Sequence, residues 1–159
     1  MTVNFHGLDK FIEKGMVRRW HTVPDLSQNV AEHSWGVAMF LIAFHPSPSA
    51  ALLKAAILHD LHESAFCDIP SHIKDKYPEL VQIEEAEEQL FFKRHGIQNP
   101  YDDLADDDFL WLKLADTEES IAFILSQTMK SAKHFEILSR LQEKSNGIKK
   151  QLGIEGIAA

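Results

Sequence analysis

The stretch AAILHDLHES, residues 55–64, decides the fold because it places ionisable groups inside an apolar helical pattern. Its first four residues are apolar and are typical of a buried helix. His59, Asp60 and Glu63 then follow on the side that faces the expected core. An ionised carboxylate that is buried without a partner is costly, so the core of this protein must supply a compensating group.

The rest of the sequence predicts helices on both sides of this stretch. Ser27 and Ser49 are suitable N-caps for the helices that begin just after them, and Gly96 is a suitable residue to end a third helix. No alternation of apolar and polar residues lasts long enough to indicate a strand. We therefore expect an all-α fold, a single-domain helical bundle over residues 1–159. The expected helices cover 8–17 (ending near Gly15), 28–45, 50–64, 78–95, 106–132 and 133–152.

Composition limits the class of protein. The chain has 159 residues, of which 45% are hydrophobic, and its formal net charge is −8. This acidic balance argues against non-specific binding to nucleic acid or to an anionic membrane. Cys67 is the only cysteine, which excludes an internal disulfide and fits a reducing compartment. The sequence has no apolar signal segment and no run of membrane length, so we expect a soluble, cytoplasmic protein (in the host cytoplasm if a phage encodes it).

Three of the expected helices carry polar residues on their apolar stripes. Taken singly, each residue has a plain structural reading, as a core histidine with a hydrogen bond or a carboxylate in an ion pair. Together, two imidazoles and two carboxylates in the centre of a bundle favour a divalent cation among them. We predict that four side chains are ligands of one Zn²⁺, Co²⁺, Mn²⁺ or Fe²⁺ ion: His33, His59, Asp60 and Asp116.

The order of these four residues resembles that of a known family. His33, then His59-Asp60, then Asp116 follow the H…HD…D order of the HD-domain metal-dependent phosphohydrolases. The implied fold is a helical bundle, and the implied chemistry is hydrolysis at phosphorus with a bound divalent ion.

Further segments resemble the 5′-deoxynucleotidase branch of that family. HDLHESAFCDIP, residues 59–70, is similar to its HDxxE…GDxP segment, although Cys67 stands where the family often has glycine. RRWHTV, residues 18–23, and NVAEHSWGVA, residues 29–38, are similar to its Arg-Trp pair and its first histidine helix. The resemblance covers about residues 8–120. The short chain and the Arg-Trp-His-Thr-Val-Pro opening also resemble small phage-encoded dATP triphosphohydrolases.

Two residues near the expected ligands are suited to catalysis on a phosphate. Glu63 lies one turn beyond His59, where it can orient a water or move a proton, and the resemblance implies the same role. The plain alternative for Glu63 is a surface glutamate at a helix end. Arg19 can hold a phosphate through two hydrogen bonds, which matters in a chain with few basic residues to spare.

Other residues are candidates for binding the nucleotide. Trp20 can stack on a base, although a lone aromatic is more often part of a core. The resemblance gives Asp68 a hydrogen bond to a sugar hydroxyl, with a helix N-cap near Pro70 as the alternative. Lys74 and Lys113 are placed to face a longer phosphate chain, and Lys113 is equally suited to be a solvated helix charge. The predicted catalytic residues are Glu63, Arg19 and Asp68, and the predicted substrate-binding residues are Arg19, Trp20, Asp68, Lys74 and Lys113.

The sequence thus predicts a metal-dependent phosphohydrolase of 2′-deoxynucleotides that directs a water at the 5′ (α) phosphate. Two substrates stay open: a monophosphate, as for a 5′-nucleotidase, or a triphosphate, as for a dATP-type triphosphohydrolase. The cofactor is one divalent ion, with Mg²⁺ as an option at a second site on the substrate phosphates. Alternatives are a nucleotide-sensing or scaffold domain with a structural metal, and a metal-free helical interaction module. Family members often form oligomers, so a homo-oligomer is expected.

Other charged residues are expected on the surface. The acidic run from Glu84 to Glu88 is interpreted as a solvated helix face, and His62 is expected to face solvent. The remaining histidines have no partner at ligand spacing and are expected to be ordinary surface residues: His6, His21, His45, His95 and His134.

Overall fold

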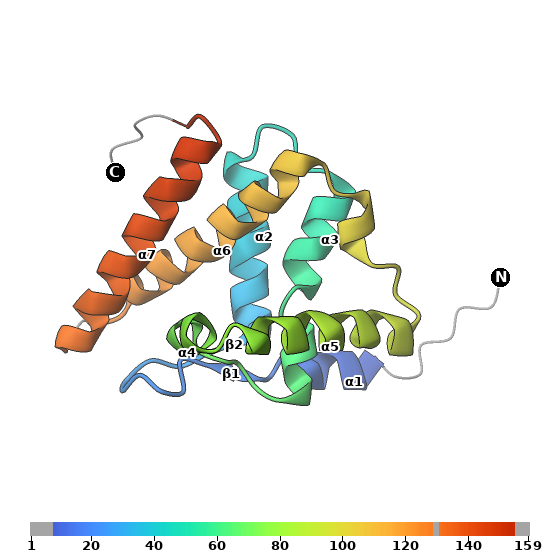
Figure 1. Cartoon of the computed structure of the whole chain (residues 1–159), viewed down its shortest axis with the longest axis horizontal. Helices are drawn as coiled ribbons and strands as arrows, with labels where there is room; N and C mark the ends of the chain where they lie inside the picture. Colours follow the sequence, from blue (N-terminus) through green and yellow to red (C-terminus); the bar gives the residue numbers. More distant parts are fainter. Residues whose placement is uncertain (1–7, 129–130, 155–159) are drawn as a thin grey trace.

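A computed structural model describes residues 8–128 and 131–154 of the chain. The fold is all-α, as the sequence predicted, and its centre is formed by α2 (Val30–Phe44), α3 (Ala50–Leu58) and α6 (Asp106–Ser126). α6 packs between α2 and the last helix, α7 (Ala132–Gln151), which leans away from the rest of the bundle (Figure 1). The core between the three central helices consists of Val37, Ala38, Leu41, Leu52, Ala55, Ala56, Leu112 and Ala115.

A second layer closes one end of these helices. α5 (Glu79–His95) runs across the bundle, with α1 (Leu8–Lys14) and the short α4 (Ser71–Lys76) near it (Figure 1). Phe91 and Phe92 of α5 pack against Val30 at the start of α2 and against Leu61. Gly96 ends α5 in the left-handed conformation, at φ +63°, where the sequence placed the end of this helix.

A short antiparallel pair of strands, β1 (Arg18–Arg19) and β2 (Gln28–Asn29), corrects two expectations. No strand was predicted here, and the N-cap of the following helix was expected at Ser27. The cap is Asn29, which forms a reciprocal capping box with Glu32, so α2 begins at Val30. Ser27 Oγ instead accepts a hydrogen bond from Arg18 Nη2 at 2.7 Å.

The helix expected over 50–64 is interrupted. α3 ends at Leu58, His59 is its C-cap, and the chain continues through Asp60 into a 3₁₀ turn, η1 (Leu61–Ala65). A 3₁₀ turn has three residues per turn rather than 3.6, so the side chains after Asp60 point in directions that an α-helix would not give. His62 is therefore buried, not solvent-facing as expected.

The helix expected over 106–132 is also shorter than predicted. α6 ends at Ser126 because Gln127 takes an extended conformation, and Ser131 caps α7, which starts at Ala132. The part of the prediction that falls on residues 129–130 lies outside the described residues, as does His6. None of the helices described here has the length and apolar character that crossing a membrane would require.

Candidate functional site

The four predicted ligands converge where α2, the end of α3 and α6 meet. His33 Nε2 lies 3.3 Å from His59 Nε2 and 3.5 Å from Asp60 Oδ2. His59 Nε2 lies 3.4 Å from the same Asp60 oxygen. Asp116 Oδ1 completes the group at 3.2 Å from His33 Nε2. The structure thus places two imidazoles and two carboxylates face to face, although they come from distant parts of the sequence.

These separations fit a shared metal ion. Zn²⁺ binds histidine nitrogen and carboxylate oxygen at about 2.0–2.2 Å, so two donors on a tetrahedral ion lie about 3.3–3.6 Å apart. The nitrogen and oxygen separations of 3.2–3.5 Å match that spacing closely. Two nitrogens and two carboxylates also suit Co²⁺ and Mn²⁺. The donor atoms of His33, His59 and Asp60 all lie within 4.8 Å of one another and fit a shared divalent ion. Asp116, the fourth predicted ligand, adjoins this group through its contact with His33.

Hydrogen bonds behind the imidazoles hold them in the orientation that metal binding needs. His33 Nδ1 contacts Glu119 Oε2, and His59 Nδ1 donates to the carbonyl oxygen of Ala56 at 2.9 Å. A proton on Nδ1 leaves the Nε2 lone pair of each ring free to bind a metal, and partners of this kind raise ligand basicity.

The contact to His33 extends into a longer network that the sequence analysis missed. Glu119 Oε1 accepts a hydrogen bond from Gln28 Nε2 at 2.6 Å, and Gln28 Oε1 accepts one from Trp20 Nε1 at 3.2 Å. The pair Asp116-x-x-Glu119 was a usable signal, because residues three apart share a helix face. Gln28 had no comparable signal, since its position depends on the strand pair. Gly36 leaves room for this network, because a Cβ there would lie 2.6 Å from Glu119 Cγ.

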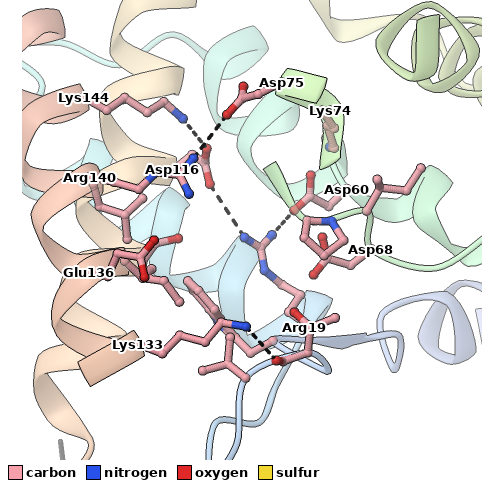
Figure 2. Close-up of a pocket in the computed structure, with 18 of the residues that line it drawn as sticks. Arg19, Asp60, Asp68, Lys74, Asp75, Asp116, Lys133, Glu136, Arg140 and Lys144 are labelled. Carbon is pink, nitrogen blue, oxygen red and sulfur yellow. Dashed lines mark hydrogen bonds and ion pairs between the residues drawn. The ribbon is translucent and has the colours of Figure 1, made fainter. Parts of the chain in front are cut away.

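Arg19 places a buried positive charge beside the ligand set. Its guanidinium contacts Asp60 and lies 3.9 Å from Asp116 Oδ1, between the two carboxylates (Figure 2). Burial opposes the charge on Asp60, but His59, Arg19 and His33 outweigh this effect and lower its pKa to about 2. Burial also opposes the charge on Asp116, and His33 and Arg19 again hold its pKa well below the usual range. Both carboxylates are therefore ionised at neutral pH.

The surroundings of Glu63 raise its pKa, whereas those of Asp60 and Asp116 lower theirs. Glu63 is 4% exposed, and its Oε2 has no hydrogen-bond partner among the described residues. Burial, followed by the negative charges of Asp60 and Asp68, raises the pKa of Glu63 to about 9. The alternative of a surface glutamate at a helix end is therefore wrong. Glu63 is a buried carboxyl that holds its proton at neutral pH, beside carboxylates that do not.

These groups open into a cavity of about 750 Å³ between β1, η1, α6 and α7 (Figure 2). Most of the predicted site residues line it: Arg19, Trp20, Asp60, Glu63, Asp68, Lys74 and Asp116. Lys113 does not line it and is exposed on α6, in keeping with the solvated charge weighed for it. The sequence analysis missed three basic residues of α7 that also line the cavity: Lys133, Arg140 and Lys144.

The residues predicted to bind nucleotide have further contacts inside the protein. The Trp20 ring stacks on Phe123, with 6.0 Å between ring centroids and 18° between planes, so Trp20 is both part of a core and part of the cavity wall. Asp68 is not a helix cap, because α4 begins after Pro70 with no side-chain cap. Lys74 Nζ forms an ion pair with Glu84 Oε1 at 2.7 Å.

Cys67 has a backbone conformation that explains the glycine often found at this position in the family. Its φ is +73°, in the left-handed region that favours glycine. The chain therefore keeps the turn before Asp68 and adopts it with a residue that carries a Cβ.

Several residues expected on the surface are buried. Glu84 and His134 are buried, and the His134 Nε2–H donates to the carbonyl oxygen of Pro24 at 3.1 Å. Glu88 accepts a hydrogen bond from the Tyr101 hydroxyl at 2.8 Å, and its Oε1 lies 3.7 Å from His62 Nδ1. Two residues of the acidic run on α5, Glu84 and Glu88, therefore pack against the protein instead of facing solvent. Helical spacing alone did not show this, because the packing of η1 and the Tyr101 segment against α5 decides it.

The buried carboxyl of Glu88 predicts a pH-dependent stability. Burial raises its pKa to about 7 despite the Tyr101 hydrogen bond, whereas the unfolded chain has the usual value of 4.5. The folded state therefore binds more protons between these values, so this group lowers the free energy of unfolding as pH rises from 4.5 to 7. In Glu88→Gln this contribution disappears, and the gain in stability over the wild type should grow by up to about 1.4 kcal/mol per pH unit across the window.

Urea denaturation at pH 5, 6, 7 and 8 measures this difference. Glu79→Gln is the control, because Glu79 lies on the same helix and is exposed. Parallel stability curves for wild type and Glu88→Gln would contradict the raised pKa.

Comparison with known proteins agrees with the fold and with the family that the sequence resembles. The HD domain family matches residues 14–137, so the chain belongs to the HD domain family. Among solved structures, the cyanophage S-2L HD phosphohydrolase (DatZ), bound to dA and one catalytic Zn²⁺ ion, is similar with a TM-score of 0.68. That similarity has 20% sequence identity and covers 100% of this chain and 90% of the phage protein. No curated protein sequence matches the chain.

Proposed function

We propose that this protein is a metal-dependent phosphohydrolase that acts on 2′-deoxynucleotides at the 5′ (α) phosphate. One observation carries the proposal: the His33, His59, Asp60 and Asp116 donors converge, and Asp60 and Asp116 line the same cavity as Arg19 and Glu63. The HD domain match supports the same class of activity. The similar cyanophage protein was solved with dA and one catalytic Zn²⁺, which supports a deoxynucleotide and a divalent ion.

The divalent ion, when bound, polarises a phosphoryl oxygen and lowers the pKa of a coordinated water. Arg19 supplies the complementary charge from the protein. Burial opposes the guanidinium charge, but Asp60 and Asp116 outweigh this and raise the Arg19 pKa, so the side chain stays protonated. Its Nε has no hydrogen-bond partner among the described residues, which leaves a donor for a phosphate oxygen.

Glu63 is the proton carrier of the proposal. Its Oε2 faces no hydrogen-bond partner within the described chain, and its raised pKa keeps a proton on the carboxyl near neutral pH. A carboxyl that holds its proton in this way can donate it to the leaving oxygen. A scaffold domain with a structural metal would gain nothing from a buried carboxyl that carries an unpaired oxygen.

Trp20 and Asp68 are proposed to hold the nucleoside. Trp20 is fixed by Gln28 and by Phe123, so its ring can offer a base a rigid stacking surface at little entropic cost. Asp68 lines the same cavity beyond the left-handed turn at Cys67 and is proposed to accept a hydrogen bond from a sugar hydroxyl.

The test is a substrate panel with each deoxynucleoside mono- and triphosphate, in the presence of Mn²⁺, Co²⁺, Zn²⁺ or Mg²⁺. Chromatography of the products should show a free deoxynucleoside with at least one of the first three ions, and none after chelation. Ribonucleotides are the matched controls for the sugar. Failure to hydrolyse any deoxynucleotide with any of the ions would contradict the proposed function.

A further inference from the structure

The basic residues of α7 form one wall of the cavity. Lys133, Arg140 and Lys144 are spaced seven and four residues apart, so they share one face of the helix. Arg140 and Lys144 extend from α7 toward Asp116 (Figure 2). Both follow residue 137, where the match to the HD domain family ends, so membership of the family assigns them no role.

These two cations lie next to the ligand set. Lys144 Nζ is 3.9 Å from Asp116 Oδ2, while the other oxygen of the same carboxylate faces His33. Arg140 Nη2 is 3.2 Å from Asp75 Oδ2, so Arg140 reaches across the cavity toward α4. The positive charge of α7 therefore begins beside the proposed reaction centre and continues outward along the cavity.

The present partners of these cations can be displaced. The side chains of Lys144 and Arg140 are 52% and 47% exposed, and Asp75 is more exposed still. Exposed ion pairs of this kind contribute little to stability, so an incoming phosphate can replace them. Arg19, by contrast, is 13% exposed and held between Asp60 and Asp116, whose side chains are 15% and 31% exposed. The cavity thus has one fixed cation near the ligands and two movable ones farther along.

We propose that Arg140 and Lys144 bind the β- and γ-phosphates of a deoxynucleoside triphosphate. This inference rests on the proposed function and names the substrate class for that same site. Water forms a bond to the α-phosphorus, the bond from that phosphorus to O5′ breaks, and O5′ takes up a proton. The products are a deoxynucleoside and an intact triphosphate, which carries the oxygen of the water. A monophosphate offers no charge to the α7 wall, whereas a triphosphate carries several negative charges that need partners.

Asp75 and Glu136 also line the cavity, so its wall carries both negative and positive charges rather than positive charges alone. Acidic neighbours weaken the binding of a general polyanion, while Arg140 and Lys144 remain available to a phosphate tail that starts at the reaction centre. This arrangement suits a short phosphate chain anchored at its α-phosphate.

The experiment compares dATP and dAMP with the Mn²⁺-loaded wild type, the double variant Arg140→Gln/Lys144→Gln and the control Lys150→Gln. Lys150 is exposed on the same helix and does not line the cavity. Each charged contact to phosphate is worth about tenfold, so the double variant should lower kcat/KM for dATP about 30- to 100-fold. The ratio of kcat/KM for dATP to that for dAMP should fall at least about tenfold, and Lys150→Gln should keep the wild-type ratio.

A second readout does not depend on turnover of a nucleotide. Inorganic triphosphate, with Mn²⁺ in excess, should inhibit the wild type, and its inhibition constant should rise about tenfold or more in the double variant. The single variants Arg140→Gln and Lys144→Gln serve if the double variant melts early.

The outcomes separate the two proposals. A wild type that prefers dAMP and releases orthophosphate overturns the triphosphate subsite and leaves the phosphohydrolase standing. Equal losses for dATP in the double variant and in Lys150→Gln overturn the role of Arg140 and Lys144. A wild type that hydrolyses none of the deoxynucleoside mono- and triphosphates of the panel, with any of the ions, overturns the proposed function and the subsite with it.

Discussion

Replacing Glu63 with glutamine is expected to lower kcat by about 10²- to 10⁴-fold while the protein keeps its metal affinity. Glutamine matches the size of the protonated carboxyl, which is the form that burial favours at neutral pH. The fold should therefore persist, and only the transfer of a proton is lost. Steady-state kinetics on the best substrate of the panel, together with metal content measured by elemental analysis, tests the two halves of this expectation.

Glu13→Gln is the control for that experiment, because Glu13 is exposed on α1 and away from the cavity. Its kcat should stay within about twofold of the wild type, as for most surface substitutions. If Glu63→Gln turned over as fast as the control, Glu63 would have no part in the chemistry. A nucleotide-binding scaffold with a structural ion would then explain the site better.

Gly36→Ala is expected to weaken metal binding, although it replaces none of the four predicted metal ligands. The new Cβ would lie 2.6 Å from Glu119 Cγ and 3.0 Å from Glu119 Oε1. Glu119 cannot simply swing aside, because one of its oxygens contacts His33 and the other accepts a bond from Gln28. Moving it releases the His33 ring, and loss of such an outer partner typically reduces metal affinity or activity about 10- to 100-fold. Overpacking should also lower the free energy of unfolding by about 1–3 kcal/mol.

Gly147→Ala provides the matched comparison. Gly147 lies within α7, and a Cβ there would meet nothing within 4 Å, so alanine should stabilise the helix by about 0.5–1 kcal/mol. Metal titration and thermal melting of both variants, with and without a chelator, separate the effect on the site from the effect on the fold. Wild-type metal affinity in Gly36→Ala would show that Glu119 does not hold His33 for binding.

The spacing of apolar residues in the sequence was informative wherever the chain forms a regular α-helix. Val30, His33, Val37 and Leu41 lie on one buried stripe of α2, so the intrusion of a histidine was visible from spacing alone. The same holds for Asp116 on α6, and the resemblance to the HD-domain family supplied the order of the ligands. The all-α fold and the family were predicted correctly for this reason.

Prediction from sequence failed where the backbone leaves the α-helix or where distant segments meet. The 3₁₀ turn after Asp60 changed the direction of His62, and the strand pair shifted the start of α2 to Val30. Glu84, Glu88 and His134 were misjudged because their burial depends on elements far away in the chain. The basic face of α7 was missed for the same reason. Arg140 and Lys144 are recognisable as cavity residues only from their contacts with Asp75 and Asp116, which lie far away in the sequence.

The sequence separation of the site residues determines when during synthesis the site can assemble. His33 and Glu119 are 86 residues apart, and Arg19 is 41 residues from Asp60. A ribosome adds about 5–20 residues per second, so at least about four seconds pass between translation of His33 and translation of Glu119, which contacts it. An ion captured by the growing chain would at first be held by fewer ligands than the finished protein offers. Metal loading should therefore be a late event, completed only after α6 has left the ribosome and docked against α2.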